Sequence, residues 1–376
     1  MNKLSGFFTK DRRYVYLTGM VLAGLSALMW QRTPSRLSFL GNGAGLMAVE
    51  AVCAVFAVMA VIAFIVKLTH WKNYSGTFEK KRGMLVAAKV MFWAVALVFV
   101  LTIIDRVLLE LISIAQDAAA AGKNPTSAVA SMLYMSWNGR SILLYGIGMT
   151  VRIALIGTAV AFVLSILMVF LRIQKPARQD NDLVRFLKVV GSTFAKLYIT
   201  VIRGTPMMVQ ALIFYYAGFN IFKSTGMSVT EVNNVWSVGF SGLITVSLNS
   251  TAYLAEVLRG GIESIDAGQT EAARSLGMTS WQTMYKVVFP QAVKNSIPAI
   301  GNEFIINIKD SSVLSVIGVM DLMYATTTVV GLYYKSLEMY IVAAIIYLVL
   351  TYLSSLIMKA ISRKLDTPAR DLPSSN

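Results

Sequence analysis

Cysteine, histidine and charged residues are scarce in this chain of 376 residues, and each shortage excludes a class of protein. There is one cysteine, Cys53, and one histidine, His70. A single cysteine forms no intramolecular disulfide bond, and no Cys/His cluster has the spacing of a metal site. These two residues also provide neither a nucleophile with a neighbouring base nor a set of metal ligands, which argues against an intramembrane enzyme. We therefore expect no catalytic residues and no metal site.

Hydrophobic residues dominate the composition. They make up 56% of the chain and charged residues only 14%, whereas about a quarter of the residues in ordinary soluble domains are charged. An apolar run of about 20 residues is long enough to cross a bilayer as a helix. Such runs fall near 14–30, 44–68, 84–104, 142–171, 204–222, 235–258, 297–320 and 338–360. The sequence predicts an all-α polytopic membrane protein with about eight transmembrane helices, in contact with membrane lipid.

The net charge of +15 is explained by where the basic residues lie. With the N-terminus inside, 24 of the 34 Lys and Arg residues fall in inner segments, seven in outer segments, and Lys89, Arg152 and Lys309 within or near spans. This is the positive-inside asymmetry of membrane proteins. We expect both termini to be cytoplasmic and expect no nucleic-acid partner.

The chain divides into a first part whose hydrophobic segments contain few polar residues and a second part whose spans contain more of them. We expect an N-terminal extension with three transmembrane segments, an extracytoplasmic linker rich in Ala, Ser and Gly, a five-span core and a cytoplasmic tail, at 1–105, 106–140, 141–365 and 366–376. The stretch 183–203 predicts a helix in the inner membrane interface, with a tilted extension of the next span as the alternative. Pro206 suits the first turn of the helix that follows. We expect Asp105 and Arg106 to lie at the outer interface without a special role.

The inner loop at 259–296 contains "EAARSLGMTSWQTMYKVVFP", a polar stretch at 271–290 between apolar spans. Asp266 followed by Gln269 predicts an N-cap with a capping-box partner. The helix that follows would run to about Leu276, where Gly277 suits a left-handed end. A second box pairs Thr279 with Gln282.

The second predicted helix of this loop carries Trp281, Tyr285 and Phe289 on one side and ends at Pro290. The first presents small residues, which are Ala267, Ala272 and Ala273. A connector resting on the membrane surface is the alternative, but two cap signals and a tight turn specify more shape than a connector needs. Shape without catalytic groups predicts a docking element. Small side chains let another backbone approach closely, and Glu271 and Arg274 can steer the encounter, unless Glu271 caps its own helix.

At this point a family resemblance is visible. Residues 271–290 resemble the "EAA…G…P" loop of bacterial ATP-binding-cassette (ABC) importer permeases, with Glu271, Ala272, Ala273, Gly277 and Pro290 at the family's spacing. The blocks "RGTPMMVQ", "NSTAYLAEVLRGGIESIDAGQ" and "NEFIINIKDSSVLSVIGV" are similar to the polar amino acid uptake family. The resemblance covers about 141–365, the five-helix permease core, and leaves 1–140 without a counterpart. Phe289 departs from the Leu that commonly precedes the proline.

The resemblance implies a set of partners. The loop would hold a coupling helix that docks on a separate ATPase, with Glu271, Ala272, Ala273, Arg274 and Gly277 as the coupling residues. Two ATPase subunits, a second permease copy or a related permease, and an extracytoplasmic solute-binding protein would complete an importer in the bacterial inner membrane. This chain has no G-x-x-x-x-G-K-[ST] phosphate loop. We expect no cofactor in this chain, with ATP and Mg bound by the partner ATPase, and no enzymatic activity of its own.

Ionisable groups inside spans are costly and are candidate functional residues. Glu303 lies five residues past Pro298, and Asn307 lies one turn further on the same face. A carboxylate beside an amide suits the ammonium group of an amino acid, and the resemblance implies that this helix lines the translocation path. The predicted substrate-pathway residues are Glu303, Asn307, Gln210, Lys309 and Asp310. The alternatives are that Glu303 pairs with Lys309 or Arg203, and that Gln210 forms an interhelical hydrogen bond.

A second class of function is an ion-coupled secondary transporter of small polar solutes. Such transporters contain inverted repeats and broken helices near the bilayer midplane. The stretch "SSVLSVIG" would permit a broken helix, but no convincing repeat is visible and the 271–290 loop would have no purpose. The sequence therefore favours the permease.

Overall fold

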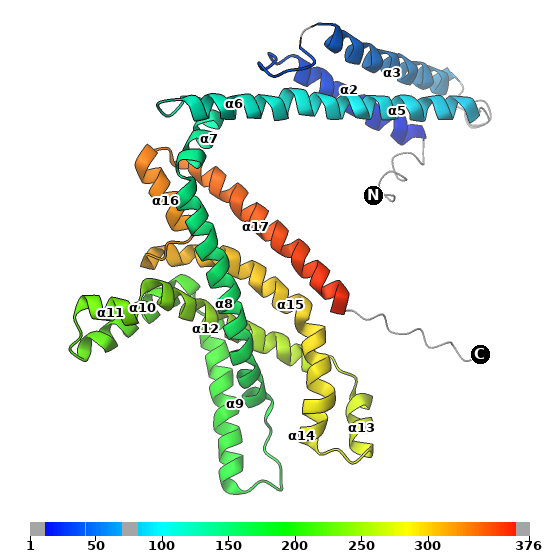
Figure 1. Ribbon diagram of the computed structural model, residues 1–376. Helices are drawn as coiled ribbons and strands as arrows, with labels where there is room; N and C mark the ends of the chain where they lie inside the picture. Colours follow the sequence, from blue (N-terminus) through cyan, green and yellow to red (C-terminus); the bar gives the residue numbers. More distant parts are fainter. Residues whose placement is uncertain (1–11, 42, 70–81, 366–376) are drawn as a thin grey trace, which may run out of the picture. The chain divides into compact units, whose positions relative to one another are not determined.

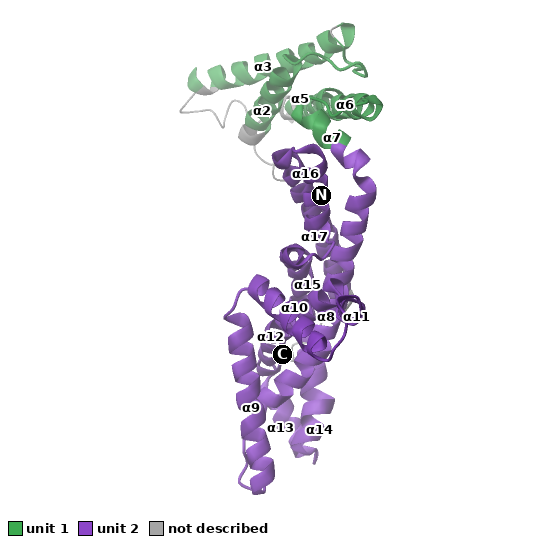
Figure 2. Ribbon diagram, turned by 90° about the vertical axis from the view of Figure 1, so that its left-hand side faces the viewer, with its two compact units in different colours: residues 1–134 green, residues 135–376 purple. Residues whose placement is uncertain are grey.

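A computed structural model describes residues 12–41, 43–69 and 82–365. All regular secondary structure in these ranges is helical (Figure 1), which confirms the all-α prediction. The chain forms two compact units, Met1–Tyr134 and Met135–Asn376, coloured separately in Figure 2. His70 and the predicted tail at 366–376 lie outside the described residues.

The first unit is built on three long helices. Its elements are α2 (Arg12–Trp30), α3 (Ala44–Thr69), α5 (Arg82–Ile103), the π-helix η1 (Ile104–Leu108) and α6 (Leu109–Ala120), and α7 (Ala128–Asn138) crosses into the second unit. Phe56 of α3 and Val95 of α5 are fully buried in one apolar core. A Cβ on Gly19 would lie 2.3 Å from the Phe56 ring. The absence of a side chain at Gly19 therefore allows α2 and α3 to pack closely.

The segment 106–140 is mainly helical, although its composition predicted a linker. Within the segment, α6 and α7 are separated only by residues 121–127. Alanine is the strongest helix former, so an Ala-rich stretch is ordered as helix once it has something to pack against. Gly122 and Pro125 fall in the short break, where residues of their type belong.

Asp105 and Arg106 are buried, which corrects the expectation that they lie at an interface without a role. The Asp105 carboxylate accepts hydrogen bonds from Ser38 Oγ at 2.7 Å and from the Phe39 backbone N–H at 2.7 Å. Arg106 pairs with Asp105 at 3.3 Å and donates to the Gly41 carbonyl at 2.7 Å. A buried ion pair survives only with such additional partners. The pair fixes the connection between α2 and α3 against the π-helical turn.

The second unit holds the predicted core. Its elements are α8 (Arg140–Ile173), α9 (Asp182–Arg203), α10 (Met207–Ser224), α11 (Val229–Val235), α12 (Val238–Glu263), α13 (Ala267–Ser275), α14 (Ser280–Thr283), η2 (Met284–Val288), α15 (Phe289–Asp310), η3 (Ser311–Ile317), α16 (Leu322–Tyr333) and α17 (Ser336–Leu365). The central helix is α12, which packs against α8, α15, α10 and α9. Its buried residues are mostly small, including Ser, Thr, Gly and Ala. A helix of such composition is stable in a membrane only when other helices surround it.

The count of eight spans is not confirmed, although each predicted apolar run lies on a described helix. Four helices of the described chain are long and apolar enough to cross a membrane, or up to six if each bent pair counts as one span. The four are 44–66, 86–120, 140–173 and 336–362. Small polar side chains lower the mean hydropathy of α12. The helix tolerates them because other helices, and not lipid, surround it.

Two bends shape the core. Helices α9 and α10 meet at 112°, which excludes α9 as a straight extension of the following span, and Pro206 is the N-cap of α10. The span that ends in η3 bends by 54° before α16. Here Gly318 is left-handed, with φ +90°, and Asp321 caps α16 through the Tyr324 N–H at 2.8 Å. The "SSVLSVIG" stretch is therefore a broken helix.

Candidate functional site

The predicted turn in the 259–296 loop is present. Gly277 has φ +80° and follows α13 directly. Its N–H donates to the Arg274 carbonyl at 3.0 Å, and the Met278 N–H donates to the Ala273 carbonyl at 3.2 Å. These two bonds are the pair that defines a Schellman motif. The local chemistry of one glycine therefore ends α13 where the sequence predicted.

The two predicted caps differ in outcome. Thr279 and Gln282 form the full capping box, with bonds of 2.9 Å and 3.2 Å between side chain and backbone in each direction. Asp266 instead accepts from the Gly268 N–H at 2.7 Å, while the Gln269 N–H donates to the Asp266 backbone carbonyl. The first cap is thus a simple aspartate N-cap and not a box.

Pro290 does not end the second helix, which is a correction to the sequence prediction. The chain passes from α14 through η2 into α15 and stays helical to Asp310, with Pro290 in the first turn of α15. A proline inside an α-helix lacks an N–H and crowds the carbonyl four residues earlier. The π-helical turn relieves this crowding, since the Phe289 N–H donates to the Met284 carbonyl five residues back.

The aromatic face of α14 holds the loop to α8. The rings of Trp281 and Phe289 lie 5.8 Å and 5.1 Å from the ring of Phe170, and Trp281 stacks on Tyr285 at 6.5 Å. The expected small-residue face does not form. Ala273 is buried, whereas Ala267 and Ala272 are exposed, because the three positions point in different directions around the short α13.

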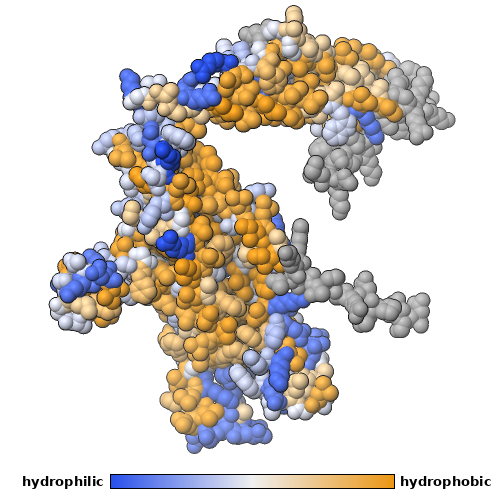
Figure 3. All heavy atoms as spheres, in the orientation of Figure 1, coloured by the Kyte–Doolittle hydropathy of each residue, from blue (hydrophilic) through white to orange (hydrophobic). Residues whose placement is uncertain are grey.

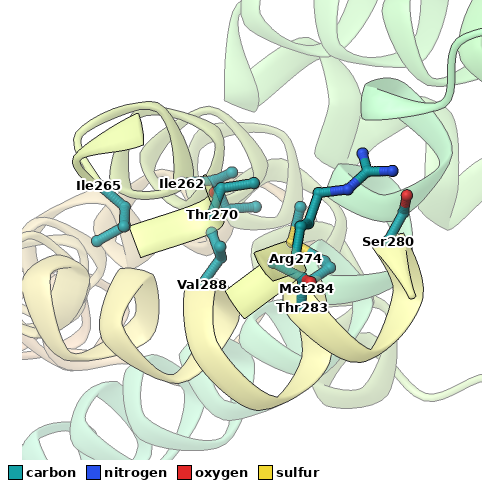
Figure 4. A pocket seen from close by; sticks show the side chains of 8 residues that line it. All are labelled: Ile262, Ile265, Thr270, Arg274, Ser280, Thr283, Met284 and Val288. Carbon is teal, nitrogen blue, oxygen red and sulfur yellow. The ribbon is translucent and has the colours of Figure 1, made fainter. Parts of the chain in front are cut away.

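A hollow of about 260 Å³ lies between the end of α12, α13 and α14 (Figure 4). The residues that line it are Ile262, Ile265, Thr270, Arg274, Ser280, Thr283, Met284 and Val288. Figure 3 shows strongly hydrophilic side chains over the part of the second unit that carries α13 and α14, and a hydrophobic surface over α8, α15 and α17. The loop is therefore the polar end of an apolar bundle.

Asn307 joins three helices inside the core. Its Nδ2 donates to Thr158 Oγ1 of α8 at 2.8 Å, and its Oδ1 accepts from Ser250 Oγ of α12 at 3.0 Å. All three side chains are buried. Glu303, one turn earlier on α15, is 8% exposed, and the Ser250 hydroxyl that donates to Asn307 lies near it. Ser250 is therefore close to both predicted pathway residues.

Gln210 is fully engaged by its own protein. Its Nε2 donates to the Ile202 carbonyl at 2.8 Å and to Thr205 Oγ1 at 2.8 Å, across the bend between α9 and α10. Its Oε1 accepts from Asn249 Nδ2 of α12 at 2.9 Å. The contacts favour the interhelical alternative for Gln210. Thr158, Asn249 and Ser250 were not predicted, although the adjacent polar residues Asn249 and Ser250 in an apolar run were a visible signal.

The structure does not contain the ion pairs proposed as alternatives for Glu303. Among the described residues, neither Lys309 nor Arg203 forms a salt bridge with it, and Arg203 stacks over the Tyr253 ring at 5.2 Å. Lys309 and Asp310 are exposed at the end of α15. The predicted pathway residues therefore split into a buried group and an exposed pair.

Charged residues also brace the base of the loop. Glu256 of α12 pairs with Arg172 of α8 at 2.9 Å and with Arg259 at 2.9 Å, and Arg259 pairs with Glu263 at 2.6 Å. Asp321, which the sequence analysis did not single out, is fully buried and caps α16. Its place at the start of a helix after a glycine was the available signal.

Comparison with known proteins places this architecture in a family. Residues 183–367 match the family described as "binding-protein-dependent transport system inner membrane component". The chain is 33% identical to the nopaline transport system permease protein of Agrobacterium fabrum, over 58% of this chain and 86% of that protein. It is 31% identical to the glutamine transport system permease protein of Escherichia coli, over 61% of this chain and 95% of that protein.

The chain belongs to this family. A crystal structure titled as an amino acid ABC transporter with histidines is also similar, with a TM-score of 0.50, 34% identity and coverage of 60% of this chain and 94% of that chain. The permease is accordingly the translocation subunit of an ABC importer, as the sequence predicted, and the secondary transporter is not favoured.

Family membership also establishes the membrane location and the kinds of partner protein of the permease. It is a multi-pass inner-membrane protein with ATPase and binding-protein partners, and ATP is hydrolysed by a separate subunit. The family match covers residues 183–367 of the second unit and does not reach the first unit.

Proposed function

We propose that this permease forms the path for a polar amino acid, delivered by an extracytoplasmic binding protein, and couples to its ATPase through the 271–290 loop. The observation that carries the coupling role is the Schellman turn at Gly277, followed at once by the capping box at Thr279. Together they hold two short helices in one exposed shape without any catalytic group. The named transport substrates of relatives, nopaline, glutamine and arginine, support the substrate class.

The coupling role is tested on the assembled complex. Deletion of 271–280 is expected to abolish co-purification of the ATPase and substrate-stimulated ATP hydrolysis while the permease still inserts in the membrane. Gly277→Asp, which strains the turn and adds a negative charge, is expected to reduce both. Intact assembly and uptake in either variant would remove the loop from the coupling role. The same purification reports stoichiometry, for which we propose two ATPase subunits per pair of permeases, with ATP and Mg bound outside this chain.

Glu303 is proposed as the substrate-facing carboxylate. It is 8% exposed, and among the described residues no Lys or Arg side chain forms a salt bridge with it. A hydrogen bond to a charged group contributes about 1.5–3 kcal/mol, or roughly 10- to 150-fold in affinity. Glu303→Gln keeps the shape and should reduce uptake of the preferred amino acid within that range. Glu338→Gln, at the start of α17, is the matched control and should leave uptake unchanged.

Assembly must be measured beside uptake for these variants. Loss of uptake with normal ATPase co-purification supports substrate contact by Glu303, and loss of both points to a structural role. Unchanged uptake in Glu303→Gln removes the residue from the pathway. Competition with a series of neutral, acidic and basic amino acids then identifies the substrate, which the carboxylate alone does not specify.

A second permease, identical or related, is proposed to face the end of α15. Lys309 and Asp310 are exposed on an otherwise apolar part of the second unit. Charged side chains inside the bilayer face protein or a water-filled cavity and not lipid. A second copy would enclose this pair together with the path. Cysteine cross-linking at position 309 in a Cys53→Ser background should give a dimer band, and its absence would contradict this placement.

The orientation of the chain follows from the distribution of basic residues, and we propose that both termini are cytoplasmic. The 106–140 segment would then lie outside, between the N-terminal extension at 1–105 and the permease core at 141–365, with a cytoplasmic tail at 366–376. A membrane-impermeant thiol reagent on single cysteines in Lys123 and Lys286 positions is the direct test. Labelling from the same side at both would refute this orientation.

A further inference from the structure

The hollow beside α13 contains a buried side-chain hydroxyl that has no hydrogen-bond partner in the described part of the chain. Thr283 Oγ1 is buried and has no hydrogen-bond partner among the described residues, and Thr283 is 2% exposed. An unsatisfied buried polar atom is uncommon in proteins and calls for an absent partner. Thr283, Arg274 and Ser280 all line the hollow, and Figure 4 shows their side chains.

Arg274 brings a positive charge to the same place. It forms no salt bridge within the described chain, and none of the three acidic side chains nearest to it along the sequence, Glu271, Asp266 and Glu263, pairs with it. Asp266 instead caps α13 by accepting a hydrogen bond from the Gly268 N–H. Glu263 pairs with Arg259 at 2.6 Å. Glu271 lies three residues earlier on α13 and forms no ion pair with Arg274 in the described part of the chain. A guanidinium that carries five N–H donors and no acceptor selects an anionic, planar partner.

The rest of the hollow is apolar. Ile262, Ile265, Met284 and Val288 form its walls. A pocket that binds a drug-sized ligand or cofactor usually measures about 300–1,000 Å³, so the volume of about 260 Å³ suits a side chain better than a nucleotide. The required occupant has an aliphatic stem and a terminal carboxylate.

We propose that the hollow receives an acidic side chain, a glutamate in preference to an aspartate, from the surface of the ATPase subunit. The carboxylate pairs with Arg274 and accepts hydrogen bonds from Ser280 and Thr283, and its stem packs on Met284 and Val288. The inference rests on the proposed coupling role of the loop and adds the chemistry of its partner. Charge pairs of this kind at interfaces set register and specificity as well as affinity.

The test uses the full permease–ATPase complex. Arg274→Glu is expected to reduce ATPase co-purification by at least about tenfold, because it places like charges together in a desolvated site. Lys294→Glu is the matched control, since Lys294 is basic, exposed and near in sequence but lies outside the 271–290 loop and does not line the hollow. It should change assembly much less.

A charge-exchange scan identifies the partner. Each surface Glu and Asp of the ATPase is changed to Lys in turn and combined with Arg274→Glu. One such change should restore assembly of the complex, and Thr283→Val should weaken the wild-type complex without affecting membrane insertion. Wild-type assembly in Arg274→Glu overturns the proposal. Failure of every ATPase variant to restore assembly also overturns it. The assembly assay is repeated with the permease in nanodiscs without anionic lipid, and restored assembly of Arg274→Glu there would overturn the proposal by identifying a phosphate headgroup as the occupant.

The outcome separates this inference from the coupling role itself. If deletion of 271–280 abolishes assembly while Arg274→Glu does not, the loop docks but the occupant of the hollow is not acidic. If the deletion leaves assembly intact, the coupling role fails and the inference fails with it.

Discussion

Substitution of Gly277 tests the loop's shape independently of any contact. The backbone there has φ +80°, and a Cβ on Gly277 would meet nothing within 4 Å. Gly277→Ala therefore introduces no clash, and its cost is the conformational cost of a left-handed L-residue, about 1–2 kcal/mol. The Schellman bonds at 3.0 Å and 3.2 Å should then break more often.

The expected size of the effect follows directly. A change of about 1–2 kcal/mol raises the population of the opened turn roughly 5- to 30-fold. Hydrogen exchange of peptides covering 273–278, measured by mass spectrometry on the purified permease, reports this population. Asparagine tolerates the left-handed region better than alanine, so Gly277→Asn should exchange at a rate between those of the wild type and Gly277→Ala.

Gly260→Ala is the matched control. Gly260 is exposed near the end of α12, and a Cβ there also meets nothing within 4 Å. Its backbone is helical, so alanine should stabilise that helix by about 0.5–1 kcal/mol. Exchange in Gly277→Ala within twofold of the wild type, or faster exchange in Gly277→Asn than in Gly277→Ala, would refute the reasoning.

Three further predictions concern other parts of the chain. A Cβ on Gly146 of α8 would lie 2.8 Å from a backbone oxygen of the bend before α16, so Gly146→Ala should cost about 1–3 kcal/mol and lower the Tm, whereas Gly148→Ala, in open space, should not. Arg106→Ala leaves a buried carboxylate unpaired and should destabilise the first unit by about 3–5 kcal/mol, measured as faster proteolysis there. Hydrogen bonds from the Ser228 backbone and side chain hold the pKa of Glu231 below its ordinary 4.5, so the cap of α11 should persist above pH 4.5 and be lost as pH falls below it. Exchange of α11 amides against pH checks this, and Glu231→Gln should remove the dependence.

The helices were predictable because their signals are local or periodic. Apolar runs located the long helices except α9, which was predicted as an interfacial helix. Gly277 and Thr279 located the loop's turn, because caps are satisfied by neighbours within a few residues. Pro290 was misread because its effect depends on how the preceding turn adjusts. The π-helical turn at 284–288 has no sequence pattern that would predict it, so the rule that proline ends a helix failed here.

The partners of the polar residues were less predictable. Asn307 is separated from Thr158 by 149 positions, and the bond between them exists only once α8 and α15 pack. Asp105 and Arg106 were placed at an interface because two adjacent charges at the end of an apolar run usually lie there. Their burial depends on the chain at 38–41 folding back onto the π-helical turn, which no local pattern indicates.

The position of α12 connects these observations. Its polar composition would be costly against lipid, so it lies at the centre, where its hydroxyl and amide groups find partners on other helices. Two consecutive residues, Asn249 and Ser250, bond to Gln210 of α10 and to Asn307 of α15. The same helix ends at Glu263, and only the three residues 264–266 separate it from α13. The proposed coupling loop is thus joined to both polar clusters through one helix, and the polar residues that lower the hydropathy of α12 are those that make this connection.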